Sequence, residues 1–268
     1  MNNNNPLEFW NLDTFEISSY FDDSLEKRKN LKTNISTSDK TGLCTYTYNE
    51  LGYRGDSPKK DGFKIMSIGC SFTECTGVND WETWPHYFSK LVPNGVDLNF
   101  GNPSRSNDYI VRCLHTFYDE IKPDLVLIFY TSFLRREVYS EKGNVEPFMP
   151  TSAWDYMKTE TGKRVHRNLI ENQNDYDDFI NNWYKNHLLI KYFLETKKCN
   201  WIWNGICTTP HYYEANRFDS NIDYDDVAVD GLHAGPITNK NYAKSLYDFI
   251  LLNFPKYLPT VKEKAKFI

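Results

Sequence analysis

The sequence predicts an α/β domain built around a central parallel sheet. Short apolar runs, typical of buried strands, alternate with longer segments whose apolar residues recur at helical spacing. This alternation is typical of strand–helix–strand units, in which right-handed crossovers join parallel strands. A chain of 268 residues, of which 40% are hydrophobic and 16% aromatic, is long enough to bury one large core of this kind.

Strands are expected at about 63–68, 96–100, 125–130 and 200–203. The run Leu125–Tyr130 is apolar throughout, as expected for a central strand covered on both faces. In the last strand, Trp201 and Trp203 alternate with Ile202, which favours aromatic side chains packed in the core over a sugar-binding surface.

Helices are expected between and after these strands. Thr83 and Pro85 fit an N-cap and an early helical position. A helix from about 107 to 121 carries an apolar stripe and ends before Pro123. A long helix is predicted at about 176–196, and a final helix begins near Thr238.

The domain organisation predicted from the sequence is one main domain, residues 63–268, with an N-terminal extension. Residues 1–62 are polar and irregular, and we expect them to wrap the core, with an ordered turn at 48–55. Residues 138–174 show no clear period and are predicted to be an insertion.

Composition argues against several classes of function. A formal net charge of −5 gives no reason to propose a nucleic-acid partner. The six cysteines include no Cys-x-x-Cys pair of the kind found in metal or redox sites, so no zinc site is indicated. No segment approaches the roughly 20 apolar residues of a membrane span, and the N-terminus lacks secretory features. A cytoplasmic protein without membrane insertion is the expectation.

Two segments carry residues suited to nucleophilic catalysis. Gly69–Thr73 follows the first strand and places Ser71 at the carboxyl end of the sheet, where catalytic groups gather in open α/β folds. Near the other end of the chain, Asp230–His233 supplies a possible base, His233, and a carboxylate, Asp230, that could orient it. A turn serine or a loop histidine is commonplace, but the two segments together favour a catalytic site.

These two segments resemble, in order and position, the Gly-Asp-Ser and Asp-x-x-His segments of the SGNH/GDSL hydrolase family. The upstream Asn49–Gly55 and the downstream Glu82–Pro85 are also similar to segments of some members, so the resemblance spans most of 49–253. It implies a flavodoxin-like three-layer α/β/α sandwich. It further implies a Ser71–His233–Asp230 triad that acts on acetyl esters of carbohydrates, on lipids or on thioesters, without a metal or cofactor.

The chain departs from the family pattern where the oxyanion donors are expected. In the second block the glycine position falls on Ser104, whose backbone N–H could still donate, and Gly101 is the other alignment. In the third block, Tyr130–Glu137 contains no asparagine. Ser132 or Thr131 could donate instead. Arg135 could supply positive charge, or Arg135 and Arg136 could form a solvated loop or one that is ion-paired with Glu137.

The function expected from the sequence is therefore that of a serine esterase acting on a small-molecule or glycan ester, with O-acetyl carbohydrates slightly favoured. An acyltransferase that uses the same site, or a catalytically weak or inactive module that binds a glycan or a protein, are the other hypotheses. Cys70, beside the serine, is interpreted as a packed thiol. His211 is interpreted as a surface-loop residue that could touch substrate.

Overall fold

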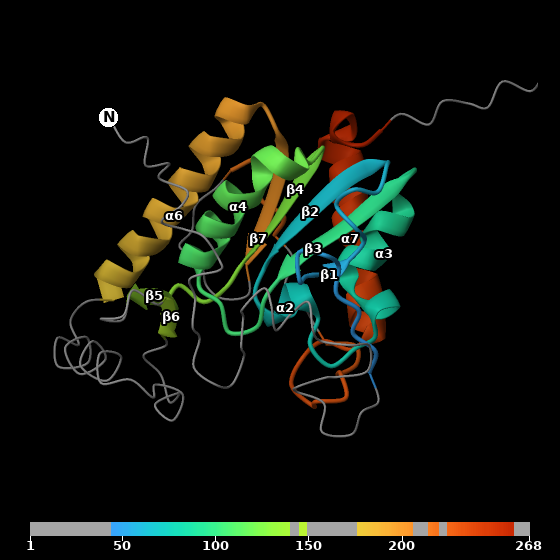
Figure 1. The fold of residues 1–268 in the computed structure, drawn as a ribbon, viewed down its shortest axis with the longest axis horizontal. Coiled ribbons are helices and arrows are strands. Elements are labelled where there is room, and N and C mark those ends of the chain that lie inside the picture. The colour runs from blue at the N-terminus through green and yellow to red at the C-terminus, as the bar shows by residue number, and fades with distance from the viewer. Residues whose placement is uncertain (1–43, 140–144, 149–175, 206–213, 220–223, 260–268) are drawn as a thin grey trace, which may run out of the picture.

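The computed structural model describes residues 44–139, 145–148, 176–205, 214–219 and 224–259. In these residues a five-stranded sheet, in the order β1-β3-β2-β4-β7, is covered by helices on both faces (Figure 1). The strands are β1 (Arg54–Gly55), β2 (Phe63–Gly69), β3 (Gly95–Gly101), β4 (Leu125–Tyr130) and β7 (Asn200–Gly205). The last four run parallel, as predicted, and β1 is an antiparallel edge strand.

The order of the parallel strands defines where a ligand is expected to bind. The first of them, β2, lies between β3 and β4, so the chain winds to one side of β2 and then crosses back to the other. Gly69, at the end of β2, is level with Gly101 of β3 and Phe129 of β4. Ligands of open α/β sheets bind outside the carboxyl ends of the strands at such a switch point.

The helices form the two outer layers. They are α3 (Trp84–Leu91) and α7 (Pro236–Asn253) on one face, and α4 (Asn107–Ile121) and α6 (Tyr176–Lys197) on the other. Alternate residues of β4 are buried against opposite layers: Val126 and Ile128 lie in the core under α4 and α6, whereas Leu127 and Phe129 lie in the core under α3 and α7. This two-sided burial explains why β4 is apolar throughout.

Local signals predicted most element boundaries correctly. Thr83 caps α3 by accepting a hydrogen bond from the backbone N–H of His86 at 3.2 Å. Helix α4 spans 107–121 and strand β4 spans 125–130, as expected. Helix α7 begins at Pro236, earlier than Thr238, because a proline at the first helical position leaves no N–H without a partner.

The described part of the N-terminal segment contributes an edge strand. Residues 44–47 bond the loop 77–80, and strand β1 pairs Arg54 with Asn99 of β3. The sheet is therefore not wholly parallel. A two-residue strand carries no period that sequence reasoning could detect. Residues 1–43 lie outside the described part of the chain.

The predicted insertion begins with a small hairpin. Strands β5 (Arg136–Tyr139) and β6 (Val145–Phe148) pair antiparallel beside the main sheet. The remaining residues of the predicted insertion up to 174 lie outside the described part of the chain.

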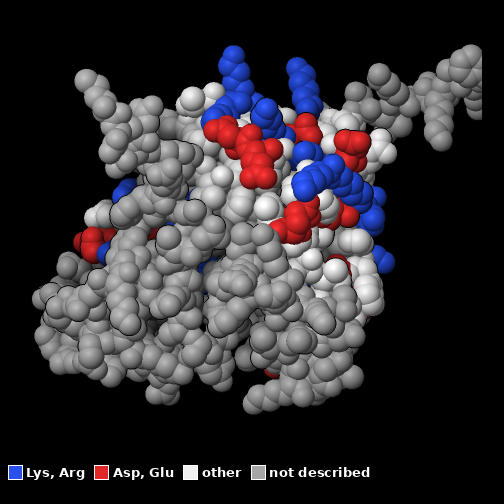
Figure 2. Space-filling model, in the orientation of Figure 1, with Lys and Arg blue, Asp and Glu red and all other residues white. Residues whose placement is uncertain are grey.

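The described surface mixes both signs of charge. On the face shown in Figure 2, acidic and basic side chains are interspersed over the upper part of the molecule. Within the described residues, no helix combines the length and apolar character that crossing a membrane requires.

Candidate active site

Ser71 is positioned by a short helix that follows the central strand directly. Helix α2 (Ser71–Glu74) begins one residue after β2 ends, and Cys70 between them accepts hydrogen bonds from the N–H groups of Thr73 and Glu74. Figure 1 shows α2 and the segment that leads into α7 at the same end of the sheet. Ser71 therefore lies at the carboxyl end of the parallel strands, where the Asp230–His233 segment also lies.

Ser71, His233 and Asp230 form a continuous hydrogen-bonded series. The hydroxyl oxygen of Ser71 lies 2.9 Å from Nε2 of His233. On the other side of the ring, Nδ1 lies 2.6 Å from Oδ2 of Asp230. The side chain of His233 is 18% exposed and that of Asp230 is 7% exposed, so the series is largely shielded but open at the imidazole. Donation from Nδ1 to the carboxylate leaves Nε2 as the acceptor of the serine proton.

The second oxygen of Asp230 is held by the backbone. Oδ1 accepts hydrogen bonds from the N–H groups of Leu232 at 3.0 Å and His233 at 3.1 Å. Burial by itself raises the pKa of Asp230, but the Leu232 N–H and the His233 side chain outweigh it and lower the pKa below 3.8. Asp230 is therefore a carboxylate at neutral pH and can only accept from His233.

The turn that carries these residues is fixed by Asp226, which sequence reasoning missed. Its carboxylate accepts hydrogen bonds from the first N–H groups of α7, those of Ile237 at 3.0 Å and Thr238 at 2.8 Å. Gly231, at φ +71°, lets the chain fold back so that Ala228 N–H reaches the carbonyl of His233 at 2.8 Å. No local motif marked Asp226, because it bonds across eleven residues of turn.

Aromatic rings border the imidazole. The Phe72 ring meets the His233 ring edge-on at 5.1 Å and stacks on Phe129. The hydroxyl of Tyr224 donates to the carbonyl oxygen of Leu232 at 3.4 Å, and burial together with the negative charge of Asp230 raises the pKa of Tyr224. Tyr224 is therefore a protonated, exposed phenol that contacts the backbone of Leu232, the residue before His233, and no pattern in the sequence indicated it.

Cys70 is fully buried and its thiol bonds none of the three residues, in agreement with its interpretation as a packed thiol. Ser71, in contrast, is 7% exposed and contacts the imidazole. His211 lies outside the described residues.

Gly101 packs against helix α2, and its N–H is already hydrogen-bonded, which argues against a role as oxyanion donor. Its N–H donates to Oδ1 of Asn99 at 2.9 Å, so that donor is already used within the loop. A Cβ at Gly101 would lie 2.0 Å from the backbone nitrogen of Glu74, so only glycine lets β3 approach α2 this closely. Asn99 also donates to the Thr73 carbonyl at 2.9 Å and ties the same helix to β3. Ser104 and Gly101 are the two candidates for the second oxyanion donor. Unlike that of Gly101, the N–H of Ser104 does not bond a side chain of its own loop, and Ser104 adopts φ +61°.

The segment after β4 is organised by Asn107. Its side chain accepts from the N–H of Thr131 at 3.0 Å and donates to the Thr131 carbonyl at 3.1 Å, so the Thr131 backbone is occupied. The Thr131 hydroxyl is buried with no hydrogen-bond partner. The Ser132 hydroxyl accepts from Leu134 N–H at 3.3 Å, which leaves its own proton available to donate.

Arg135 does not pair with Glu137. Glu137 instead binds Arg112 of α4, with Oε1 and Nη2 2.6 Å apart, while Arg136 pairs with Asp178 at 2.8 Å. Nε and Nη1 of Arg135 are buried with no hydrogen-bond partner. Of the two alternatives, the Arg135–Glu137 ion pair is therefore not formed, and Arg135 lies in the segment that follows β4. In the part of the chain that the structure describes, no group of three or more His, Cys, Asp or Glu residues is arranged to hold a metal ion.

Comparison with known proteins gives remote structural likenesses only. No family model and no curated protein sequence matches the chain. A protein assigned to the G-D-S-L lipolytic family from Desulfitobacterium hafniense DCB-2 is similar at 16% identity and a TM-score of 0.32, over 70% of this chain and 99% of that one. A family 3 carbohydrate esterase from Clostridium thermocellum is similar at 15% identity and a TM-score of 0.33, over 74% and 100%.

A carbohydrate acetylesterase family member from Sinorhizobium meliloti is similar at 10% identity and a TM-score of 0.33, over 72% of this chain and 99% of that one. At such identities and TM-scores these likenesses carry no argument about the site, whose chemistry has to be argued from its own atoms.

Proposed function

We propose that this protein is a serine esterase in which Ser71, His233 and Asp230 act as nucleophile, base and orienting carboxylate. The observation that carries the proposal is the hydrogen-bonded series, with 2.9 Å between Ser71 and His233 and 2.6 Å between His233 and Asp230. Serine is a weak nucleophile unless a base lies within hydrogen-bond reach and a third group orients that base. The two distances support both conditions, a base within reach of Ser71 and a carboxylate that orients that base.

The reaction proceeds in two halves. The Ser71 oxygen attacks the ester carbonyl while Nε2 of His233 takes the hydroxyl proton, and Asp230 stabilises the imidazolium. The imidazolium then gives this proton to the leaving alcohol, and an acyl–Ser71 ester remains. Water next attacks that ester with His233 again as base, which releases the carboxylic acid and restores the serine.

The negative charge that develops on the carbonyl oxygen needs donors other than an asparagine. We assign this role to the backbone N–H groups of Ser71 and Ser104 and to the hydroxyl of Ser132, with Arg135 supplying positive charge nearby. Ser71 is the first residue of α2, where N–H groups lack acceptors within the helix. Ser104 and Ser132 follow β3 and β4, the two strands that flank β2.

We propose an O-acetyl group on a carbohydrate as the first ester to test. The ring of Phe72 offers an apolar surface beside His233, and the exposed Tyr224, bonded to the Leu232 carbonyl, adds an aromatic ring with a polar hydroxyl. A small-molecule or glycan ester needs no nucleic-acid or membrane partner, and we propose none.

The test uses p-nitrophenyl acetate for turnover and a fluorophosphonate probe for covalent labelling of the serine. Wild type should label with one probe per chain and turn over, Ser71→Ala should do neither, and Cys70→Ser should behave as wild type. Wild type that neither labels nor exceeds Ser71→Ala in turnover would contradict the esterase proposal and favour a non-catalytic binding module. Adding glycerol or a free sugar as acceptor then separates hydrolysis from acyl transfer, because a transferase yields the new ester in preference to acetate.

A further inference from the structure

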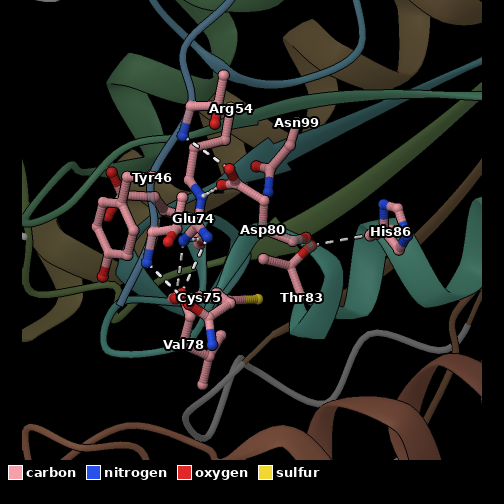
Figure 3. Close-up of polar contacts among 12 residues, drawn as sticks. Tyr46, Arg54, Glu74, Cys75, Val78, Asp80, Thr83, His86 and Asn99 are labelled. Carbon is pink, nitrogen blue, oxygen red and sulfur yellow. Dashed lines mark hydrogen bonds and ion pairs between the residues drawn. The ribbon is translucent and has the colours of Figure 1, made fainter. Parts of the chain in front are cut away.

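A buried arginine, Arg54, holds the loop that follows the Ser71 helix. Its side chain is 2% exposed, and Nη1 donates to the carbonyl oxygens of Glu74 at 2.8 Å and Cys75 at 3.1 Å. Nη2 donates to the carbonyl oxygen of Val78 at 3.0 Å. In Figure 3 the guanidinium of Arg54 points into the loop, with these residues around it. The planar guanidinium of Arg54 thus donates hydrogen bonds to three carbonyl oxygens of the loop 74–78.

Two further residues hold Arg54 itself. Its Nε donates to Oδ1 of Asp80 at 2.9 Å, and the Tyr46 ring lies 4.0 Å from the guanidinium carbon. Burial alone would lower the pKa of Arg54, but the charge of Asp80 and other nearby groups outweighs it, and the pKa is raised. The side chain is therefore cationic and fixed on more than one side.

The loop 74–78, which Arg54 binds, continues directly from helix α2, the helix that carries Ser71. Glu74 is the last residue of α2, and the N–H of Thr76 donates to the carbonyl oxygen of Ser71 at 3.1 Å. Cys75, between them, adopts a left-handed conformation at φ +60°, which turns the chain sharply at the point that Arg54 binds. A shift of this loop would therefore shift Ser71.

The same loop also touches the segment that carries the base. The carbonyl of Gly77 accepts from Val229 N–H at 3.2 Å, and the N–H of Gly77 donates to the Tyr46 hydroxyl at 2.5 Å. Gly77 has φ +84°, and a Cβ there would lie 3.1 Å from Cγ of Asp230. One short loop therefore contacts the Arg54–Tyr46 pair on one side and the Asp230 segment on the other.

We propose that Arg54 is a positioning residue that sets the distance between Ser71 and His233 through the loop 74–78. The inference rests on the proposed function of the site and adds to it a residue outside the reacting groups. A misplacement of about 1 Å in an active site can reduce the rate about 10²-fold. Loss of the guanidinium would leave the three loop carbonyls without their donors and let the loop move.

The first test counts active sites before it measures rates. In the full chain, Arg54→Gln and Arg54→Lys are titrated with the fluorophosphonate, and kcat for p-nitrophenyl acetate is expressed per titrated site. Arg54→Gln should keep most of its sites while kcat per site falls about 10²-fold at little changed KM. Arg54→Lys, which keeps the charge without the fork, should lie between Arg54→Gln and wild type. Arg112→Lys is the matched control, because Arg112 is a buried, ion-paired arginine on α4.

A residue needed only for folding would give a different pattern. The number of titrated sites would fall with activity, and kcat per site would stay at the wild-type value. That outcome would overturn the positioning role. Should Arg54→Gln fail to fold, Tyr46→Phe removes only the hydroxyl that accepts from Gly77 N–H. It is expected to lower kcat per site in the same direction, and wild-type kcat in that variant would overturn the role.

The second test does not depend on turnover. Proton NMR follows the Nδ1 proton of His233, which a hydrogen bond to Asp230 moves downfield, with His233→Asn assigning the signal. The signal should weaken or shift in Arg54→Gln and persist in Arg112→Lys. If wild type shows no esterase activity but the signal still responds to Arg54, the esterase proposal fails and positioning stands. If the signal and kcat per site are both unchanged in Arg54→Gln, positioning fails and the esterase proposal stands.

Discussion

The hydroxyl of Ser71 and Nε2 of His233 lie 2.9 Å apart although 162 residues separate them in the chain. Two turns at the same edge of the sheet create this contact, one after β2 and one before α7. Each turn is fixed by its own bonds: Asn99 ties α2 to β3, and Asp226 ties the Asp230–His233 turn to α7. The contact therefore depends on the parallel sheet that places both turns at one edge, and the following predictions test its parts.

Replacement of Ser71 by alanine should lower kcat by about 10⁴-fold or more, because no other group described at the site can form the acyl intermediate. Cys70→Ser is the matched neighbour, since Cys70 is fully buried and should leave kcat within a few-fold of wild type. Initial rates with p-nitrophenyl acetate measure both. Loss of activity in Cys70→Ser with retention in Ser71→Ala would reverse the assignment of the nucleophile.

Asp230→Asn should lower kcat by about 10⁴-fold with little change in thermal stability. An amide oxygen can still accept from the N–H groups of Leu232 and His233, so the turn should hold. An amide no longer offers a charged acceptor for Nδ1, and the imidazole loses its preferred tautomer. Steady-state kinetics and a melting curve test this together. A rate within tenfold of wild type would exclude Asp230 as the orienting group.

Ser132→Ala should lower kcat about 10²-fold if its hydroxyl stabilises the oxyanion. Thr131→Val is the control: the Thr131 hydroxyl is buried with no partner, so its removal should leave kcat unchanged and stability equal or slightly higher. Initial rates and urea midpoints are measured for both variants, so that an effect on catalysis is separated from an effect on stability. Equal kcat in Ser132→Ala and wild type would leave the backbone N–H groups as the oxyanion donors.

Gly101→Ala and Gly231→Ala should differ in their cost to stability. A Cβ at Gly101 meets the backbone of Glu74 at 2.0 Å, which cannot move without displacing α2, so we expect a loss of about 3 kcal/mol or more. A Cβ at Gly231 meets nothing within 4 Å, and only its φ of +71° is unfavourable, so about 1 kcal/mol is expected. Urea unfolding measures both. A Gly231 variant less stable than the Gly101 variant would refute the packing argument.

Stability should fall with rising pH because of Asp97, a fully buried carboxyl on β3. Burial raises its pKa from 3.8 to about 7; Nδ1 of His86 lies 4.0 Å away, and burial lowers the pKa of that imidazole. Between pH 3.8 and about pH 7, the folded chain holds a proton on Asp97 that the unfolded chain releases. Wild type therefore loses stability as pH rises through this window and levels off above it.

Asp97→Asn removes this titration. The variant and wild type should be equally stable near pH 4, and the variant should be the more stable by up to about 4 kcal/mol at pH 8. Urea midpoints measured across the range give the difference between the two curves. Parallel curves from pH 4 to pH 8 would show that Asp97 is ionised in the folded protein throughout.

Local patterns in the sequence determined most of the layered fold. The apolar run Leu125–Tyr130 and the stripe of the helix 107–121 matched the observed elements because strand burial and helical spacing are written in neighbouring residues. Ser71, Asp230 and His233 were proposed as site residues from short segments that follow a strand or precede a helix, and the structure places these three side chains in hydrogen-bond contact. Their residue types limit what chemistry the site can perform.

Tertiary structure alone decided how that chemistry is held. Arg54 binds a loop that lies 20 to 24 residues further along the chain, and Glu137 pairs with Arg112 of another element rather than with the neighbouring Arg135. Gly101 supports packing against α2 and gives its N–H to Asn99, which no local pattern revealed. These contacts join segments that meet only when the sheet has formed, so their partners depend on distances in space that the order of residues does not state.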